Sequence, residues 1–152
     1  MPEIVALFLF VVLLCVAVLH LYWALGGLWP AGDEAALARM VVGVKNMEEM
    51  PGTALTIVVA ALIATAGVLP LVFTDILPDP VSGLLPVAFR SYLPLVMLGA
   101  LALVFLARGT LSYTSYFRKM EAVEPFVTLD RNYYAPLCLL LGAGFALLAL
   151  GL

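Results

Sequence analysis

Four long runs of this chain carry no Asp, Glu, Lys or Arg, and no other feature limits the possible folds as strongly. They cover residues 4–32, 50–74, 91–107 and 132–152. Each run is close to or longer than the roughly 20 residues that a helix needs to cross a bilayer. Hydrophobic residues make up 65% of the chain, well above the share in a soluble domain, so much of the surface must face lipid. The sequence therefore predicts an all-α integral membrane protein with four spans.

The expected spans cover residues 4–29, 53–73, 91–117 and 132–152 and form one bundle, a single domain that occupies the whole chain. The first should end at Trp29 and Pro30, because Trp favours the membrane interface and proline stops a helix. After it, the segment Gly32-Asp33-Glu34 can cap a short interfacial helix whose apolar residues fall near one face. The second connection contains three prolines and should be non-helical. Asp130 should cap the fourth span.

The basic residues predict the orientation of the four spans. The first and third connections and the start of the fourth span together contain five of them: Arg39, Lys45, Arg118, Lys119 and Arg131. The opposite side offers Arg90 and the amino terminus. Since cytoplasmic loops carry the excess of Lys and Arg, connections one and three should be cytoplasmic and both termini outside. The abundance of Ala, Leu, Val and Gly suggests a bacterial inner membrane.

His20 and Arg108 are the ionisable residues embedded in the expected spans, and such residues are functional candidates by default. His20 lies 16 residues beyond Ile4, which is about 24 Å along a helix. Arg108 lies 18 residues beyond Arg90, which is about 27 Å. The two side chains should therefore lie at a similar height, in the cytoplasmic half of the bundle.

Other polar and aromatic residues collect at the same height. Trp23 and Ser112 each lie about one helical turn beyond one of the two ionisable residues. We expect a pocket for an amphipathic ligand, such as a lipid headgroup or a quinone-like molecule, between the helices. Its candidate residues are His20, Trp23, Arg108, Ser112, Tyr113 and Tyr133. Simpler roles remain open: His20 bonding a backbone carbonyl, Arg108 reaching the headgroups, and the aromatic residues forming an interfacial belt.

Several chemistries fit the sequence poorly. A metal site needs clustered ligands, and this chain has one histidine. Proton-coupled exporters need a carboxylate within the membrane, and none of the expected spans contains one. The net charge of -3 is scattered and includes no basic patch for nucleic acid. The sequence identifies no cofactor.

Two sequence blocks carry a family resemblance. Residues 20–27 read HLYWALGG and residues 129–138 read LDRNYYAPLC. With these blocks, and with residues 38–43 and Met50-Pro51, the chain resembles a bacterial family of small four-span membrane proteins classed as a domain of unknown function. The resemblance covers most of the chain. It implies the fold and the topology, and it implies no reaction.

Two further functions stay open beside ligand binding. Small residues at Ala60, Ala64 and Gly67, and at Gly142 and Ala146, allow close helix packing. The protein could therefore be a non-catalytic accessory subunit that uses these stripes to contact a membrane-protein partner or a second copy. It could also be an enzyme that uses His20 as an acid or base. Membrane lipid is the expected partner in each case.

Overall fold

A computed structural model of the chain describes residues 1–45, 49–79, 83, 86–114 and 123–151. Four of its helices are long and apolar enough to cross a membrane. They are α1 (Pro2–Ala24), α3 (Thr53–Phe73), α5 (Leu93–Leu111) and a continuous helix over Phe126–Ala149. The last consists of α7 (Phe126–Leu129), the π-helical turn η2 (Asp130–Tyr134) and α8 (Ala135–Ala149). The expected all-α, four-helix membrane bundle is confirmed.

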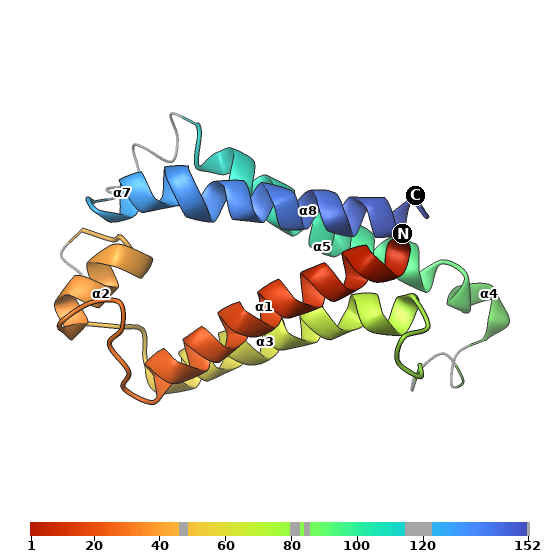
Figure 1. Ribbon diagram of the computed structural model, residues 1–152, viewed down its shortest axis with the longest axis horizontal. Coiled ribbons are helices and arrows are strands. Elements are labelled where there is room, and N and C mark those ends of the chain that lie inside the picture. Colours follow the sequence, from red (N-terminus) through yellow and green to blue (C-terminus); the bar gives the residue numbers. More distant parts are fainter. Residues whose placement is uncertain (46–48, 80–82, 84–85, 115–122, 152) are drawn as a thin grey trace.

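The bundle consists of two helical hairpins. Helix α1 packs along α3, and α5 packs along α8 (Figure 1). Small residues allow the close approach within each hairpin: a Cβ atom on Gly67 would lie 3.1 Å from the Cβ of Leu13, and one on Gly142 would lie 2.7 Å from the Cγ of Leu106. Both small-residue stripes thus serve contacts inside the chain. Large apolar side chains cover the outward faces, as expected of helices in lipid.

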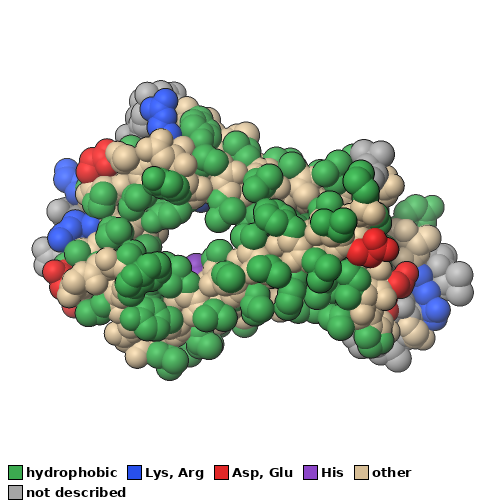
Figure 2. All heavy atoms as spheres, viewed as in Figure 1, with side chains coloured by type: hydrophobic (Ala, Val, Ile, Leu, Met, Phe, Trp, Pro, Cys, Tyr) green, Lys and Arg blue, Asp and Glu red, His purple; other side chains and the backbone are tan. Residues whose placement is uncertain are grey.

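The hairpins meet at one end and separate toward the other. Both termini lie at the end where they meet (Figure 1), which we call the terminal end. An apolar core joins α1 to α5 and α8 near this end, built from Leu9, Leu13, Leu98, Leu141 and Phe145 among others. At the opposite end, the α2 end, the hairpins stand apart. Figure 2 shows an opening between them, rimmed mainly by hydrophobic side chains, with a histidine side chain at its edge.

A bridge of loop and short-helix residues closes the α2 end. Helix α2 (Glu34–Val41) contacts α7 there. The amide of Val123 donates to the carbonyl of Gly43 over 3.0 Å. Gly43 is buried, has a φ of +71° and packs so tightly on Phe126 that a Cβ atom would lie 2.1 Å from that ring. Because both ends of the opening are closed by protein, its free sides face the bilayer.

Three element boundaries differ from the sequence-based expectation. Helix α1 ends at Ala24 rather than near Trp29, because Gly26 takes a φ of +88° that side-chain-bearing residues rarely adopt. A short helix, α4 (Val87–Arg90), interrupts the connection that was expected to be non-helical. Helix α5 ends at Leu111, before the expected position 117, and the last residues of that expected span lie outside the described residues.

The fourth helix begins earlier than residue 132. It starts at Phe126, directly after Pro125, which suits a helix start because proline has no amide proton to satisfy. Asp130 therefore lies inside the helix, in the π-helical turn, and does not cap it. The short interfacial helix does form: Asp33 caps α2, accepting a hydrogen bond of 2.7 Å from the Ala36 amide. The predicted cap within Gly32-Asp33-Glu34 is confirmed, and the predicted cap at Asp130 is wrong.

Candidate functional site

Two adjoining pockets lie at the α2 end of the α1–α3 hairpin. Their volumes are about 270 and 160 Å³, and they share Trp23, Met50, Pro51 and Thr56. We call the two together the Trp23 groove. The larger pocket extends toward α2, and the smaller one extends along α1 and α3. The smaller pocket is lined mainly by apolar side chains, including Val41, Val42, Leu55 and Val59, with His20 among them.

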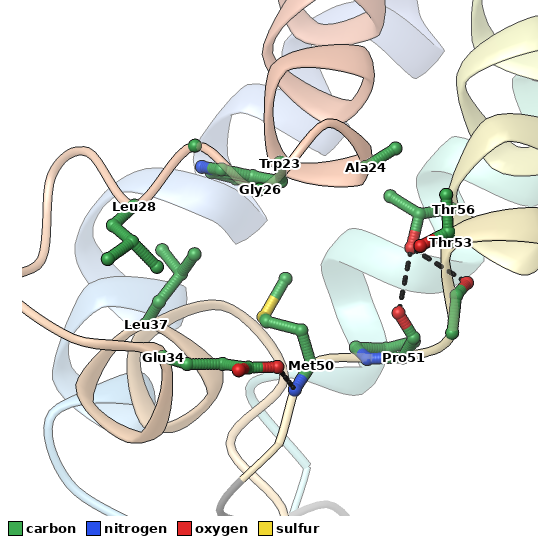
Figure 3. A pocket seen from close by; sticks show the side chains of 12 residues that line it. Trp23, Ala24, Gly26, Leu28, Glu34, Leu37, Met50, Pro51, Thr53 and Thr56 are labelled. Carbon is green, nitrogen blue, oxygen red and sulfur yellow. Dashed lines mark hydrogen bonds between the residues drawn. The ribbon is translucent and has the colours of Figure 1, made fainter.

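Three segments build the larger pocket, as Figure 3 shows. Trp23 and Leu28 come from the end of α1 and the loop after it, Leu37 and Glu34 from α2, and Met50 from the segment before α3. A Glu34 carboxylate oxygen accepts a hydrogen bond of 3.0 Å from the Met50 amide. This bond ties α2 to the start of α3 and so holds the pocket's outer wall in place.

His20 lines the smaller pocket of the groove, the one that extends along α1 and α3. Its Nδ1 lies 2.8 Å from the carbonyl oxygen of Val16, one turn earlier on α1. Its ring centre lies 5.2 Å from that of Trp23, at the spacing of aromatic pairs that attract one another. The expected face shared by His20 and Trp23 is therefore present. The Nε2 atom has no hydrogen-bond partner within the part of the chain that the structure describes.

The other polar side chains of the groove are anchored by backbone carbonyls. The indole Nε1–H of Trp23 donates to the carbonyl of Trp29 over 2.8 Å. The hydroxyl of Thr56 lies 3.2 Å from the carbonyl of Pro51 and 3.3 Å from that of Gly52. Thr56 is 6% exposed, so its position is determined by packing as well. These hydrogen bonds hold the polar side chains in the walls of the groove, so its interior volume stays open.

Arg108 belongs to a different cluster, on the α5–α8 hairpin. Its guanidinium donates to the hydroxyl of Ser112 and to the carboxylate of Asp130, each over 2.5 Å. Asp130 is 1% exposed, while the side chain of Arg108 is 38% exposed. We call these three residues the Arg108 cluster. It corrects one prediction: the fourth span does contain a buried carboxylate, which pairs with the arginine.

The tyrosines of the fourth helix divide into two orientations. Tyr133, a candidate site residue, is 66% exposed. Its neighbour Tyr134 turns inward, where its hydroxyl donates to the carbonyl of Met40 over 3.3 Å. Tyr113 donates to the carbonyl of Arg131 over 2.9 Å, across the α5–α8 hairpin. Tyr134 lies four residues after Asp130, the spacing that places two helical side chains on one face. That spacing could have identified it.

The structure thus divides the six candidates between two groups and leaves Tyr133 outside both. His20 and Trp23 lie in the groove, and Arg108 and Ser112 lie in the cluster on the other hairpin. Tyr113 lies beside the second group, and Tyr133 lies on the surface. Sequence reasoning missed Met50, Pro51, Glu34 and Asp130.

Comparison with known proteins yields a family and no characterised relative. A family model described as a protein of unknown function (DUF3995) matches residues 13–145. The matched segment includes every residue of the Trp23 groove and of the Arg108 cluster. No curated protein and no solved structure matches the chain.

Proposed function

The chain belongs to the DUF3995 family, whose function is unknown, and we propose that the protein binds an amphipathic membrane molecule in the Trp23 groove. The polar end of the molecule lies near Thr56 and His20. The apolar tail extends into the opening between the two hairpins. Lipids and quinone-like molecules belong to this class.

One observation carries the proposal: the groove changes from polar to apolar in the direction in which a membrane molecule does. Glu34 and the first turn of α3 lie at the end of the bundle, and the apolar walls of the smaller pocket follow along the spans. Mostly apolar pockets with a few placed polar groups are typical of small-molecule sites. The opening in Figure 2 supplies a route for the tail from the bilayer.

The Arg108 cluster lies on the other hairpin, outside the lining of the groove, and adds a polar patch to that hairpin. The Asp130 carboxylate offsets the charge of Arg108, so the arginine attracts an anionic headgroup weakly. Ser112 and Tyr113 stabilise the α5–α8 hairpin beside it. A ligand without net negative charge at this height fits better than an anionic one. Tyr133 would contact only the outer part of such a molecule.

We place the α2 end in the cytoplasmic half of a bacterial inner membrane. Arg39, Lys45 and Arg131 lie near this end, and Arg90 lies near the terminal end. The positive-inside rule supports the same orientation, with both termini outside.

The two other functions receive less support. The accessory-subunit hypothesis relied on the small-residue stripes, but Gly67 and Gly142 already face α1 and α5. The enzyme hypothesis relied on His20, whose contacts among the described residues are the Val16 carbonyl and the Trp23 ring. Neither contact orients the imidazole toward a reacting group of the protein.

Native mass spectrometry of protein extracted in mild detergent tests the proposal. Wild type should carry a discrete small molecule that Trp23→Ala loses. Trp29→Ala is the matched control, since this residue is 66% exposed and outside the groove lining, and its hydrogen bond with Trp23 uses a backbone carbonyl that alanine keeps. It should keep the molecule. A wild type that carries none in repeated preparations, or equal retention by both variants, would contradict binding in the groove.

A further inference from the structure

The proton on His20 can be placed from the geometry. Nδ1 lies 2.8 Å from the carbonyl oxygen of Val16. A carbonyl oxygen can only accept a hydrogen bond, so Nδ1 must carry the proton. In the neutral imidazole, Nε2 is then left with a lone pair and no proton. The free nitrogen of His20 is therefore a hydrogen-bond acceptor.

This acceptor keeps accessible surface, and the side chain that carries it lines the groove. Nε2 has no partner within the described part of the chain. In the same residues, no side-chain nitrogen or oxygen is both fully buried and without a hydrogen bond. Nε2 must consequently keep some accessible surface, and the hollow that His20 lines is the smaller pocket. In an apolar site an acceptor gains most from a donor on the ligand.

The other side chains at this end of the groove present acceptors too. The Trp23 N–H and the Thr56 hydroxyl proton are both directed at backbone carbonyls. What remains free on Thr56 is its oxygen lone pairs. Free donors are found farther along, in the first turn of α3, which has no side-chain cap and lies at the Glu34 side. The ligand atom that reaches His20 must therefore bring the proton.

We propose that the molecule held beside His20 is a lipid-chain alcohol, whose hydroxyl donates to Nε2. The inference rests on the proposed function and narrows it. A phenolic or aliphatic hydroxyl meets the requirement. An ether, an ester or a quinone carbonyl does not, because each would set a lone pair against the lone pair of Nε2. Among quinone-like molecules, the reduced quinol fits and the oxidised quinone does not.

A matched pair of probes tests this step. Farnesol and farnesyl methyl ether have the same tail. In the ether, a methyl group replaces the hydroxyl proton, so the ether has no hydrogen-bond donor. Direct binding of each to the purified full chain in detergent should show the alcohol binding about fivefold or more tightly, the effect expected from one hydrogen bond to an acceptor that would otherwise be buried unpaired. In His20→Phe, which keeps a ring and removes the acceptor, the two probes should bind equally. Trp29→Phe should keep the wild-type ratio.

The outcomes separate the inference from the function on which it rests. Equal binding of the two probes by wild type, or a preference for the ether, would overturn the assignment of an alcohol while leaving groove binding intact. A preference for the alcohol that survives in His20→Phe would overturn the role of Nε2. Binding of neither probe to wild type would overturn both. If His20→Phe does not fold in a thermal melt, the wild-type ratio decides alone.

Discussion

The two hairpins each carry polar side chains within their apolar helices, and they differ in what those side chains bond to. On the α5–α8 hairpin, Arg108 donates hydrogen bonds to the side chains of both Ser112 and Asp130. On the α1–α3 hairpin, His20 and Thr56 line a pocket, and within the described residues their hydrogen bonds go to backbone carbonyls alone. Polar groups that satisfy each other hold helices together, whereas polar groups left open beside a cavity await a ligand.

This difference assigns separate tasks to the two hairpins. Intramembrane charge is expensive, and Arg108 reduces its cost by pairing with Asp130. The pair therefore belongs to the scaffold, although its residue types alone mark it as a functional candidate. Within the described residues, His20 has no charged partner. We expect a ligand in the adjacent pocket to be its partner. Four comparisons of variants test this contrast.

Removing the arginine should have the largest effect on stability. Arg108→Met leaves the carboxylate of Asp130, 1% exposed, without its partner, and breaking a buried pair in this way costs about 3 kcal/mol. The thermal unfolding midpoint in detergent should fall accordingly. The double variant Arg108→Met, Asp130→Leu should recover most of the loss, because no buried charge remains. Wild-type stability in the single variant would show that the cluster is not part of the scaffold.

Gly43→Ala should disturb the bridge that joins the hairpins. Its Cβ would lie 2.1 Å from the Phe126 ring, and the φ of +71° is strained for alanine. Overpacking of this kind costs about 1–3 kcal/mol. Gly32→Ala, where a Cβ meets nothing within 4 Å, is the control. Unfolding midpoints compare the two variants, and equal values would mean that the bridge contact contributes nothing.

His20→Phe should separate binding from stability. The variant loses one hydrogen bond, to the Val16 carbonyl, which is worth about 1 kcal/mol, and it keeps an aromatic ring beside Trp23. Stability should change far less than in Arg108→Met, while retention of a groove ligand falls. Parallel melting and native mass spectrometry measure both quantities. A loss of stability as large as that of Arg108→Met would make His20 a scaffold residue and remove the contrast.

The smallest effect distinguishes the neighbouring tyrosines. Tyr134→Phe removes a hydrogen bond to the Met40 carbonyl, worth about 0.5–1 kcal/mol. Tyr133→Phe changes an exposed side chain and should alter the unfolding free energy by less than about 0.5 kcal/mol. Chemical denaturation resolves the two. A larger loss of unfolding free energy in Tyr133→Phe than in Tyr134→Phe would contradict the assigned orientations of the two side chains.

The sequence predicts the spans well because bilayer thickness imposes a length that charge-free runs reveal directly. It predicts the shared face of His20 and Trp23 for a similarly local reason, their three-residue spacing. The expected cap at Asp130 is wrong because capping is also a local rule, and the sequence pattern does not mark the apolar residues before Asp130 as helical. Its pairing with Arg108 joins residues 22 positions apart. The groove itself depends on how α2 folds back toward Met50, which no local pattern specifies.

Photochemical crosslinking from α3 shows whether the Trp23 groove holds a specific molecule. A photoreactive phenylalanine analogue at Val59 would face the smaller pocket, and the same analogue at Leu62, which is 65% exposed, would face outward on the same helix. After illumination in native membranes, mass spectrometry identifies the adducts. We predict one dominant adduct at position 59, absent at position 62, where bulk lipids react. The same mixture of bulk lipids at both positions would contradict the account.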